Sequence, residues 1–164
     1  MSYLVRKIER SRWNGSDIAG SRIKADVVAS CIRPNGSELS VWFAENEADI
    51  AKAKLAMLAA MNKLATVDFV ILPIAEIQDA GLKVVSTLPT LGPESLKALH
   101  RDIHDLDLDS LKVVAQIIQE HIVNKKAVRL TRDACKRMLL GAIQSNEFSA
   151  DELHADIAKN LAVA

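Results

Sequence analysis

The stretch Val67-Asp68-Phe69-Val70-Ile71-Leu72 is almost continuously apolar and ends at Pro73. Such a run is typical of an interior strand whose two faces are both covered. It follows an alanine-rich segment, residues 46–65, in which apolar side chains recur at helical spacing behind the capping residue Asn46. Residues 39–44 alternate in the period of a strand. The order strand, helix, strand predicts a βαβ unit with two parallel strands beneath one covering helix.

Further strand signals surround this unit. Residues 23–32 alternate apolar and polar side chains, and the segment Arg33-Pro34-Asn35-Gly36-Ser37 separates them from residues 39–44. Because Asn-Gly readily adopts positive φ, we predict a hairpin here. Three shorter elements are predicted in the same way: a strand at residues 3–8, a helix at 74–80 and a weaker strand at 82–86.

Beyond Pro89 the strand signals stop and helical periods take over. Four helices are predicted, over residues 93–106, 110–122, 131–142 and 153–161, the last preceded by a capping box at 149–152. The sequence therefore predicts an α+β fold: a small mixed sheet, made of a hairpin and a βαβ unit, carries one long helix and is followed by a helical, bundle-like half. We place the two halves at residues 1–88 and 89–164, as one compact unit or two closely packed subdomains.

The composition is that of a globular protein. Of the 164 residues, 49% are hydrophobic and 26% charged, and 21 basic side chains balance 21 acidic ones. Zero net charge argues against a generally basic protein that binds nucleic acid or an anionic membrane. The two cysteines are far apart, and neither an export signal nor an apolar stretch of membrane-spanning length is present. We expect a cytoplasmic protein without a disulfide framework.

Residues 100–109 form the densest polar cluster, His-Arg-Asp-Ile-His-Asp-Leu-Asp-Leu-Asp. On a helix, His100 and His104 would share one face, which is half of a metal site. Asp107 or Asp109, beyond a break in the helix, would have to complete it. This arrangement predicts a metal-dependent hydrolase or nuclease with His100, His104 and Asp107 as catalytic residues. The alternative, which we favour, is that the aspartates form a linker and the cap of the next helix.

Charge segregation points to a different function. Residues 1–33 hold seven basic and three acidic side chains, residues 34–109 six and twelve, and residues 110–164 eight and six. Two groups of basic residues stand out. The first surrounds a tryptophan in a polar loop and consists of Arg10, Arg12 and Trp13. The second lies further along the chain and consists of Lys125, Lys126, Arg129, Arg132, Lys136 and Arg137. An aromatic beside arginines is typical of an interface hot spot, although Trp13 folded back over the sheet is an equal alternative.

These basic groups predict a non-enzymatic interaction module, that is, an adaptor, inhibitor or antitoxin-like protein that binds another macromolecule through a local basic surface. A protein is the expected partner, and a nucleic acid bound by the same residues is the alternative. No membrane contact is expected. No cofactor is predicted, because the sequence has neither a GxxxxGK[ST] nor a GxGxxG motif. The oligomeric state stays open.

Overall fold

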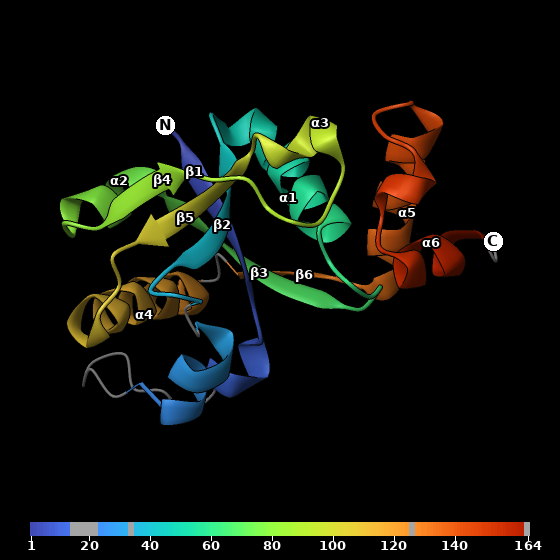
Figure 1. Ribbon diagram of the computed structural model, residues 1–164. Helices are drawn as coiled ribbons and strands as arrows, with labels where there is room; N and C mark the ends of the chain where they lie inside the picture. The colour runs from blue at the N-terminus through green and yellow to red at the C-terminus, as the bar shows by residue number, and fades with distance from the viewer. Residues whose placement is uncertain (14–22, 33–34, 125–126, 163–164) are drawn as a thin grey trace.

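The computed structural model describes residues 1–13, 23–32, 35–124 and 127–162. Within this part of the chain, six strands form one sheet in the order β4-β5-β2-β1-β3-β6, and every neighbouring pair is antiparallel (Figure 1). The strands are β1 (Tyr3–Ile8), β2 (Leu39–Ala44), β3 (Val67–Pro73), β4 (Lys83–Ser86), β5 (His100–His104) and β6 (Ala127–Leu130). The α+β class predicted from the sequence is confirmed.

Helices cover both faces of this sheet (Figure 1). The α-helices are α1 (Ile50–Ala59), α2 (Ile74–Asp79), α3 (Glu94–Lys97), α4 (Leu108–Val123), α5 (Arg132–Gln144) and α6 (Ala155–Ala162). The other helical turns are η1 (Arg10–Trp13), η2 (Val27–Cys31), η3 (Glu47–Asp49) and η4 (Ala150–Glu152). The first core joins the sheet to α1, α5 and α6, and the second joins it to α4, η1 and η2. No helix of the described residues is long and apolar enough to cross a membrane.

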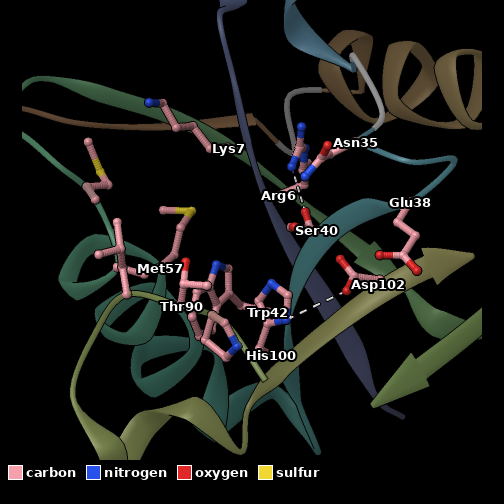
Figure 2. A pocket seen from close by; sticks show the side chains of 14 residues that line it. Arg6, Lys7, Asn35, Glu38, Ser40, Trp42, Met57, Thr90, His100 and Asp102 are labelled. Carbon is pink, nitrogen blue, oxygen red and sulfur yellow. Dashed lines mark hydrogen bonds and ion pairs between the residues drawn. The ribbon is translucent and has the colours of Figure 1, made fainter. Parts of the chain in front are cut away.

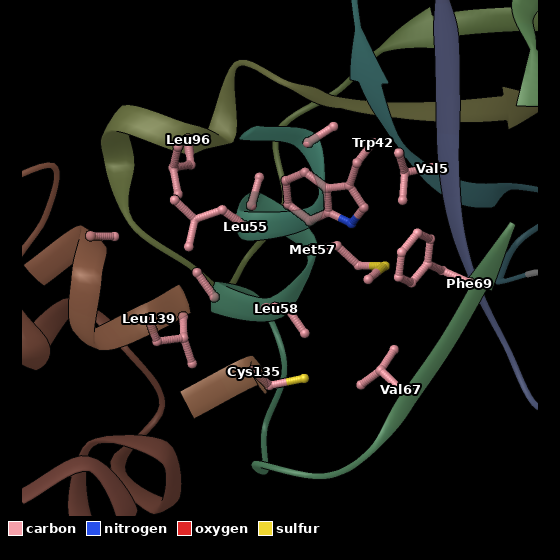
Figure 3. Close-up of a cluster of buried hydrophobic side chains, with 14 of the residues drawn as sticks. Val5, Trp42, Leu55, Met57, Leu58, Val67, Phe69, Leu96, Cys135 and Leu139 are labelled. Carbon is pink, nitrogen blue, oxygen red and sulfur yellow. The ribbon is translucent and has the colours of Figure 1, made fainter. Parts of the chain in front are cut away.

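The central strands contribute side chains to both hydrophobic cores, because successive residues point to opposite faces of the sheet. In β1, Leu4 and Val5 are both 0% exposed, yet Leu4 packs in the second core and Val5 in the first. Successive side chains of a strand point to opposite faces, so one buried strand serves two layers. The first core surrounds Phe69 of β3 and the side chains of α1 (Figure 3). The near-continuous apolar run of β3 therefore reflects burial on both faces, as predicted.

The predicted mixed sheet is wrong in one respect, the place of β1. Strands β2 and β3 are both antiparallel to β1, so they run in the same direction, as the βαβ unit requires. They are not neighbours, because β1 lies between them. Leu4 and Val5 of β1 point to opposite faces and are both fully buried, which the position between β2 and β3 allows. The crossover through α1 therefore spans β1, and the sheet has no parallel pair among its described strands.

The predicted strand at residues 23–32 is also wrong. This segment is helical, and η2 buries Val27, Cys31 and the following Ile32 in the second core. Val27 and Cys31 are four apart, a spacing that satisfies a helical period as well as an alternating one, so a short window did not separate the two. The Asn-Gly turn itself exists: Asn35 bridges Glu38, with positive φ at Gly36 and Ser37. Because its first arm is not a strand, no hairpin joins residues 23–32 to β2.

The predicted helical, bundle-like second half is wrong as well. Helices α4, α5 and α6 are confirmed, and the capping box at Ser149 is present. Residues 93–106, however, contain only the short α3 before the chain extends into β5. Strands β5 and β6 pair with β2 and β3, so both halves of the sequence contribute to one sheet. Helices α4 and α5 therefore lie in different cores and do not form a bundle.

Candidate functional site

A pocket of about 380 Å³ opens on the α1 side of the sheet. Its polar floor comes from β2 and β5, where Trp42, His100 and Asp102 lie. Its apolar wall comes from the end of α1 and the loop that follows β4. Figure 2 shows His100 and Trp42 side by side, with Asp102 on the same strand as His100 and Arg6 further along the sheet. We call this cavity the sheet pocket.

Strand register explains why these side chains meet. Strands β2 and β5 pair so that Trp42 lies opposite His100 and Ser40 lies opposite Asp102. Residues two apart on a strand share a face, so all four side chains belong to the α1 side of the sheet. The Trp42 and His100 rings contact edge to face, with centroids 4.9 Å apart. The indole therefore fixes one side of the imidazole, which is 6% exposed as a residue.

Thr87 connects His100 to Asp102. Its hydroxyl donates a hydrogen bond to Asp102 Oδ2 over 2.6 Å and lies 2.8 Å from His100 Nδ1. A threonine hydroxyl carries one proton, and that proton is directed at the carboxylate, so the oxygen must accept from Nδ1–H. This network assigns the proton of a neutral imidazole to Nδ1. The lone pair is then on Nε2, which takes no part in the contacts with Thr87 Oγ1 and Asp102.

Burial keeps His100 neutral. Removal of the ring from water lowers its pKa below the ordinary value, although the nearby Asp102 carboxylate acts in the opposite direction. In the unfolded chain the ring takes up a proton at a higher pH than in the fold. The stability contribution of His100 is therefore lost as the pH falls through the ordinary histidine pKa of about 6.5 and recovers above it. A neutral imidazole at neutral pH is the form that accepts a proton.

Arg6 of β1 lies beside this group and also lines the sheet pocket. The paired register of β1 and β2 ends at Val5 and Trp42, and the guanidinium bridges the strands beyond that point. It donates to the Ser40 carbonyl over 2.6 Å and to the Cys31 carbonyl over 3.1 Å. Burial is the main cause that lowers the Arg6 pKa to about 10. Two neutral carbonyls thus hold a cation that is poorly solvated.

The predicted metal site is not formed. His100 and His104 lie on a strand, where four residues span roughly 13 Å, instead of on one turn of a helix. His104 is partly exposed and pairs with Glu38 over 2.5 Å and with Asp105 over 3.0 Å. These contacts, with the Asp105 hydrogen bond as the largest cause, raise the pKa of His104. Within the described ranges no three His, Cys, Asp or Glu side chains converge as metal ligands.

The two aspartates of the metal hypothesis belong to the start of α4. Asp107 is its N-cap: the carboxylate accepts from the Ser110 amide over 2.8 Å, and the Ser110 hydroxyl accepts from the Asp107 amide. Hydrogen bonds from Ser110 lower the pKa of Asp107. Asp109 lies in the first turn, where a negative charge favours the helix dipole. A capping aspartate at the start of this helix is therefore confirmed, but it is Asp107, whereas the sequence favours Asp109 or Ser110, and the residues before it form β5 instead of a helix.

Four of the nine residues of the predicted basic surface make contacts within the chain. Trp13 is 4% exposed and its Nε1 donates to Cys31 Sγ over 3.2 Å, so it is no exposed hot spot and the folded-back alternative is correct. Arg12 pairs with Glu9 and Asp26. Arg129 forms a two-pronged ion pair with Asp68 at 2.8 Å, and Arg132 donates to Asn160 over 2.7 Å.

The remaining basic residues of the prediction differ in their surroundings. Arg10 and Arg137 are exposed, and Lys136 is half-buried on α5. Lys125 and Lys126 lie outside the described residues. The sequence thus drew attention to His100, but with His104 and the aspartates as its partners. It did not indicate Thr87, it grouped Arg6 only with the other basic residues around Trp13, and it considered Trp42 only as a strand residue; no spacing links these positions, since a sheet brings them together.

A scan against protein-family models finds no match to the chain. Searches of curated proteins and of solved structures likewise find no similar protein. The sheet pocket is therefore interpreted from its own chemistry.

Proposed function

We propose that the chain is a metal-independent hydrolase in which His100 acts as the general base of the sheet pocket. The observation that supports this most is the chain of contacts Asp102, Thr87, His100, in which His100 and Asp102 both line a cavity of about 380 Å³. A general base needs a lone pair, a fixed orientation and a pKa near or below neutral pH. His100 has all three.

In the proposed reaction one proton moves from water to His100 Nε2 and then to the leaving oxygen. A water molecule between Nε2 and the carbonyl carbon of a bound ester loses a proton to Nε2 as its oxygen attacks that carbon. The tetrahedral adduct then collapses, the bond to the leaving oxygen breaks, and the proton on Nε2 passes to that oxygen. While His100 is positively charged, Nδ1–H remains bonded to Thr87, whose hydroxyl remains bonded to Asp102. The buried carboxylate thereby stabilises the imidazolium.

The apolar wall of the sheet pocket suits the organic part of such an ester. Met57, Met61 and Leu91 line this wall; the methionines are flexible and Leu91 is exposed. A pocket that combines apolar walls with a few converging polar groups is the usual form of a small-molecule site. Thr87 is a positioning residue in this proposal, because it acts through His100.

Hydrolysis of p-nitrophenyl acetate tests the proposal. We expect a rate above that of free imidazole, unchanged by a chelator such as EDTA. The rate should rise with pH through a midpoint below the ordinary histidine value, because burial lowers the His100 pKa. Release of p-nitrophenolate, measured across the pH range, gives both results. Loss of activity in EDTA would contradict a metal-independent mechanism.

The interaction module and the cytoplasmic location predicted from the sequence stay predictions. Exposed Arg137 and Arg10 are the described side chains that best suit a protein partner. The internal pairing of Arg12, Arg129 and Arg132 reduces what the basic groups offer to a nucleic acid. For this reason we place the hydrolase first.

A further inference from the structure

We propose that Arg6 is the recognition residue of the sheet pocket and that its ligand there is a small organic carboxylate. This inference rests on the hydrolase proposal and specifies its substrate class: an ester that also carries a carboxylate. It is based on the surroundings of the Arg6 guanidinium, which contacts backbone carbonyl groups but no carboxylate among the described residues.

The hydrogen bonds of Arg6 are incomplete. Nη1 and Nη2 donate to the backbone oxygens of Ser40 and Cys31, and Nε is buried without any partner. Five N–H groups are available on a guanidinium, so three have no acceptor in the part of the chain that the structure describes. Among the described residues no carboxylate lies within 4.0 Å of it. Arg6 is partly buried, with its Nε fully so, and a cation withdrawn from water is normally paired, because that withdrawal costs free energy that neutral carbonyls repay only partly.

The position of Arg6 directs an anion into the sheet pocket. The residue lines this pocket together with His100, and Asp102 is close enough for its charge to raise the Arg6 pKa against the effect of burial. Asp102 does not contact the Arg6 guanidinium, so the N–H groups of Arg6 that lack an acceptor among the described residues are what a bound anion would use. A doubly charged phosphate would be repelled by Asp102, whereas a carboxylate can accept a two-pronged pair from the guanidinium. Its organic part would then lie on Met57 and Leu91.

Arg6 also lines a second cavity of about 500 Å³, together with Cys31 and Lys63. Lys7 lines both cavities but is exposed, so its ammonium is solvated by water and has less to gain from a bound anion. These two lysines provide the matched controls. Lys7→Gln removes a positive charge from the same entrance, and Lys63→Gln removes one from the second cavity only.

Benzoate and its neutral analogue benzamide, titrated into the folded protein, test the inference. We expect benzoate to shift the NMR signals of Arg6 Nε–H and of the His100 ring, and benzamide to bind at least about tenfold more weakly. Arg6→Lys should weaken benzoate binding by a similar factor, because an ammonium cannot make the two-pronged pair. Lys7→Gln and Lys63→Gln should change it little. Inorganic phosphate should bind more weakly than benzoate.

Three results would overturn the inference: equal binding of benzoate and benzamide, unchanged benzoate affinity in Arg6→Lys, or loss of binding in Lys63→Gln without a shift at His100. The wild-type titration keeps the test decisive if an Arg6 variant does not fold. If benzoate fails to bind while p-nitrophenyl acetate is still hydrolysed through His100, the carboxylate specificity falls and the hydrolase proposal stands. If benzoate binds at Arg6 and no hydrolysis occurs, the carboxylate site at Arg6 stands and the hydrolase proposal is contradicted.

Discussion

Phe69→Ala is expected to lower the free energy of unfolding by about 3–5 kcal/mol. Phe69 is 0% exposed and is the largest of the fully buried side chains. Its ring packs in the first core beside Met57, and Lys54 Nζ lies 4.8 Å from the ring centroid (Figure 3). Truncation removes this contact area and leaves a cavity beneath α1. Since domains of this size are stabilised by about 5–15 kcal/mol, the loss is a large fraction of the total.

Urea unfolding followed by circular dichroism measures this effect. Leu108→Ala is the matched control, because Leu108 is 83% exposed and its truncation should change stability by no more than about 0.5 kcal/mol. Since Met57 also lines the sheet pocket, Phe69→Ala should loosen the pocket wall and weaken ligand binding as well. Equal stability of the two variants would contradict the position of α1 over the sheet.

His100→Gln is expected to slow the hydrolysis of p-nitrophenyl acetate by at least about a hundredfold. Glutamine keeps much of the volume and can still bond Thr87, so the fold should persist, but its amide does not accept a proton at neutral pH. Thr87→Val should act differently. It removes the contact with both His100 Nδ1 and Asp102, so the pH profile should shift along with a smaller loss of rate.

His104→Gln is the matched control for His100→Gln. It lies on the same strand and the same side of the sheet, but it does not line the sheet pocket. We expect its rate to equal that of the wild type. A metal site shared by the two histidines would instead make both variants inactive. Equal rates for His100→Gln and the wild type would contradict the role of His100.

Local signals explain which elements could be predicted from the sequence. Helices α4 and α5 have long apolar stripes and capping residues, and β3 has an uninterrupted apolar run, so each carries its own signature. Strand β5 has none, because three of its five residues are histidine or aspartate. Pairing with β2 and β4 on both sides makes it a strand. Tertiary contacts thus overrode a local pattern that favoured a helix.

The candidate site illustrates the same limit. His100 and Asp102 are adjacent enough in sequence to attract attention, but their partners Thr87 and Arg6 come from a loop and from the other end of the chain. A helical spacing of the two histidines indicated a metal site, whereas the strand spacing separates them. The role of His100 therefore depends on the register of β5 against β2, which the sequence does not encode locally.

The most direct test of the account is the ¹⁵N NMR spectrum of the His100 ring as a function of pH. We predict a neutral ring protonated at Nδ1 at neutral pH, with a titration midpoint below the ordinary value of about 6.5, because burial lowers its pKa. His104 should titrate above that value, because Asp105 and Glu38 raise its pKa. A His100 ring protonated at Nε2, or one still charged at neutral pH, would contradict its assignment as the general base.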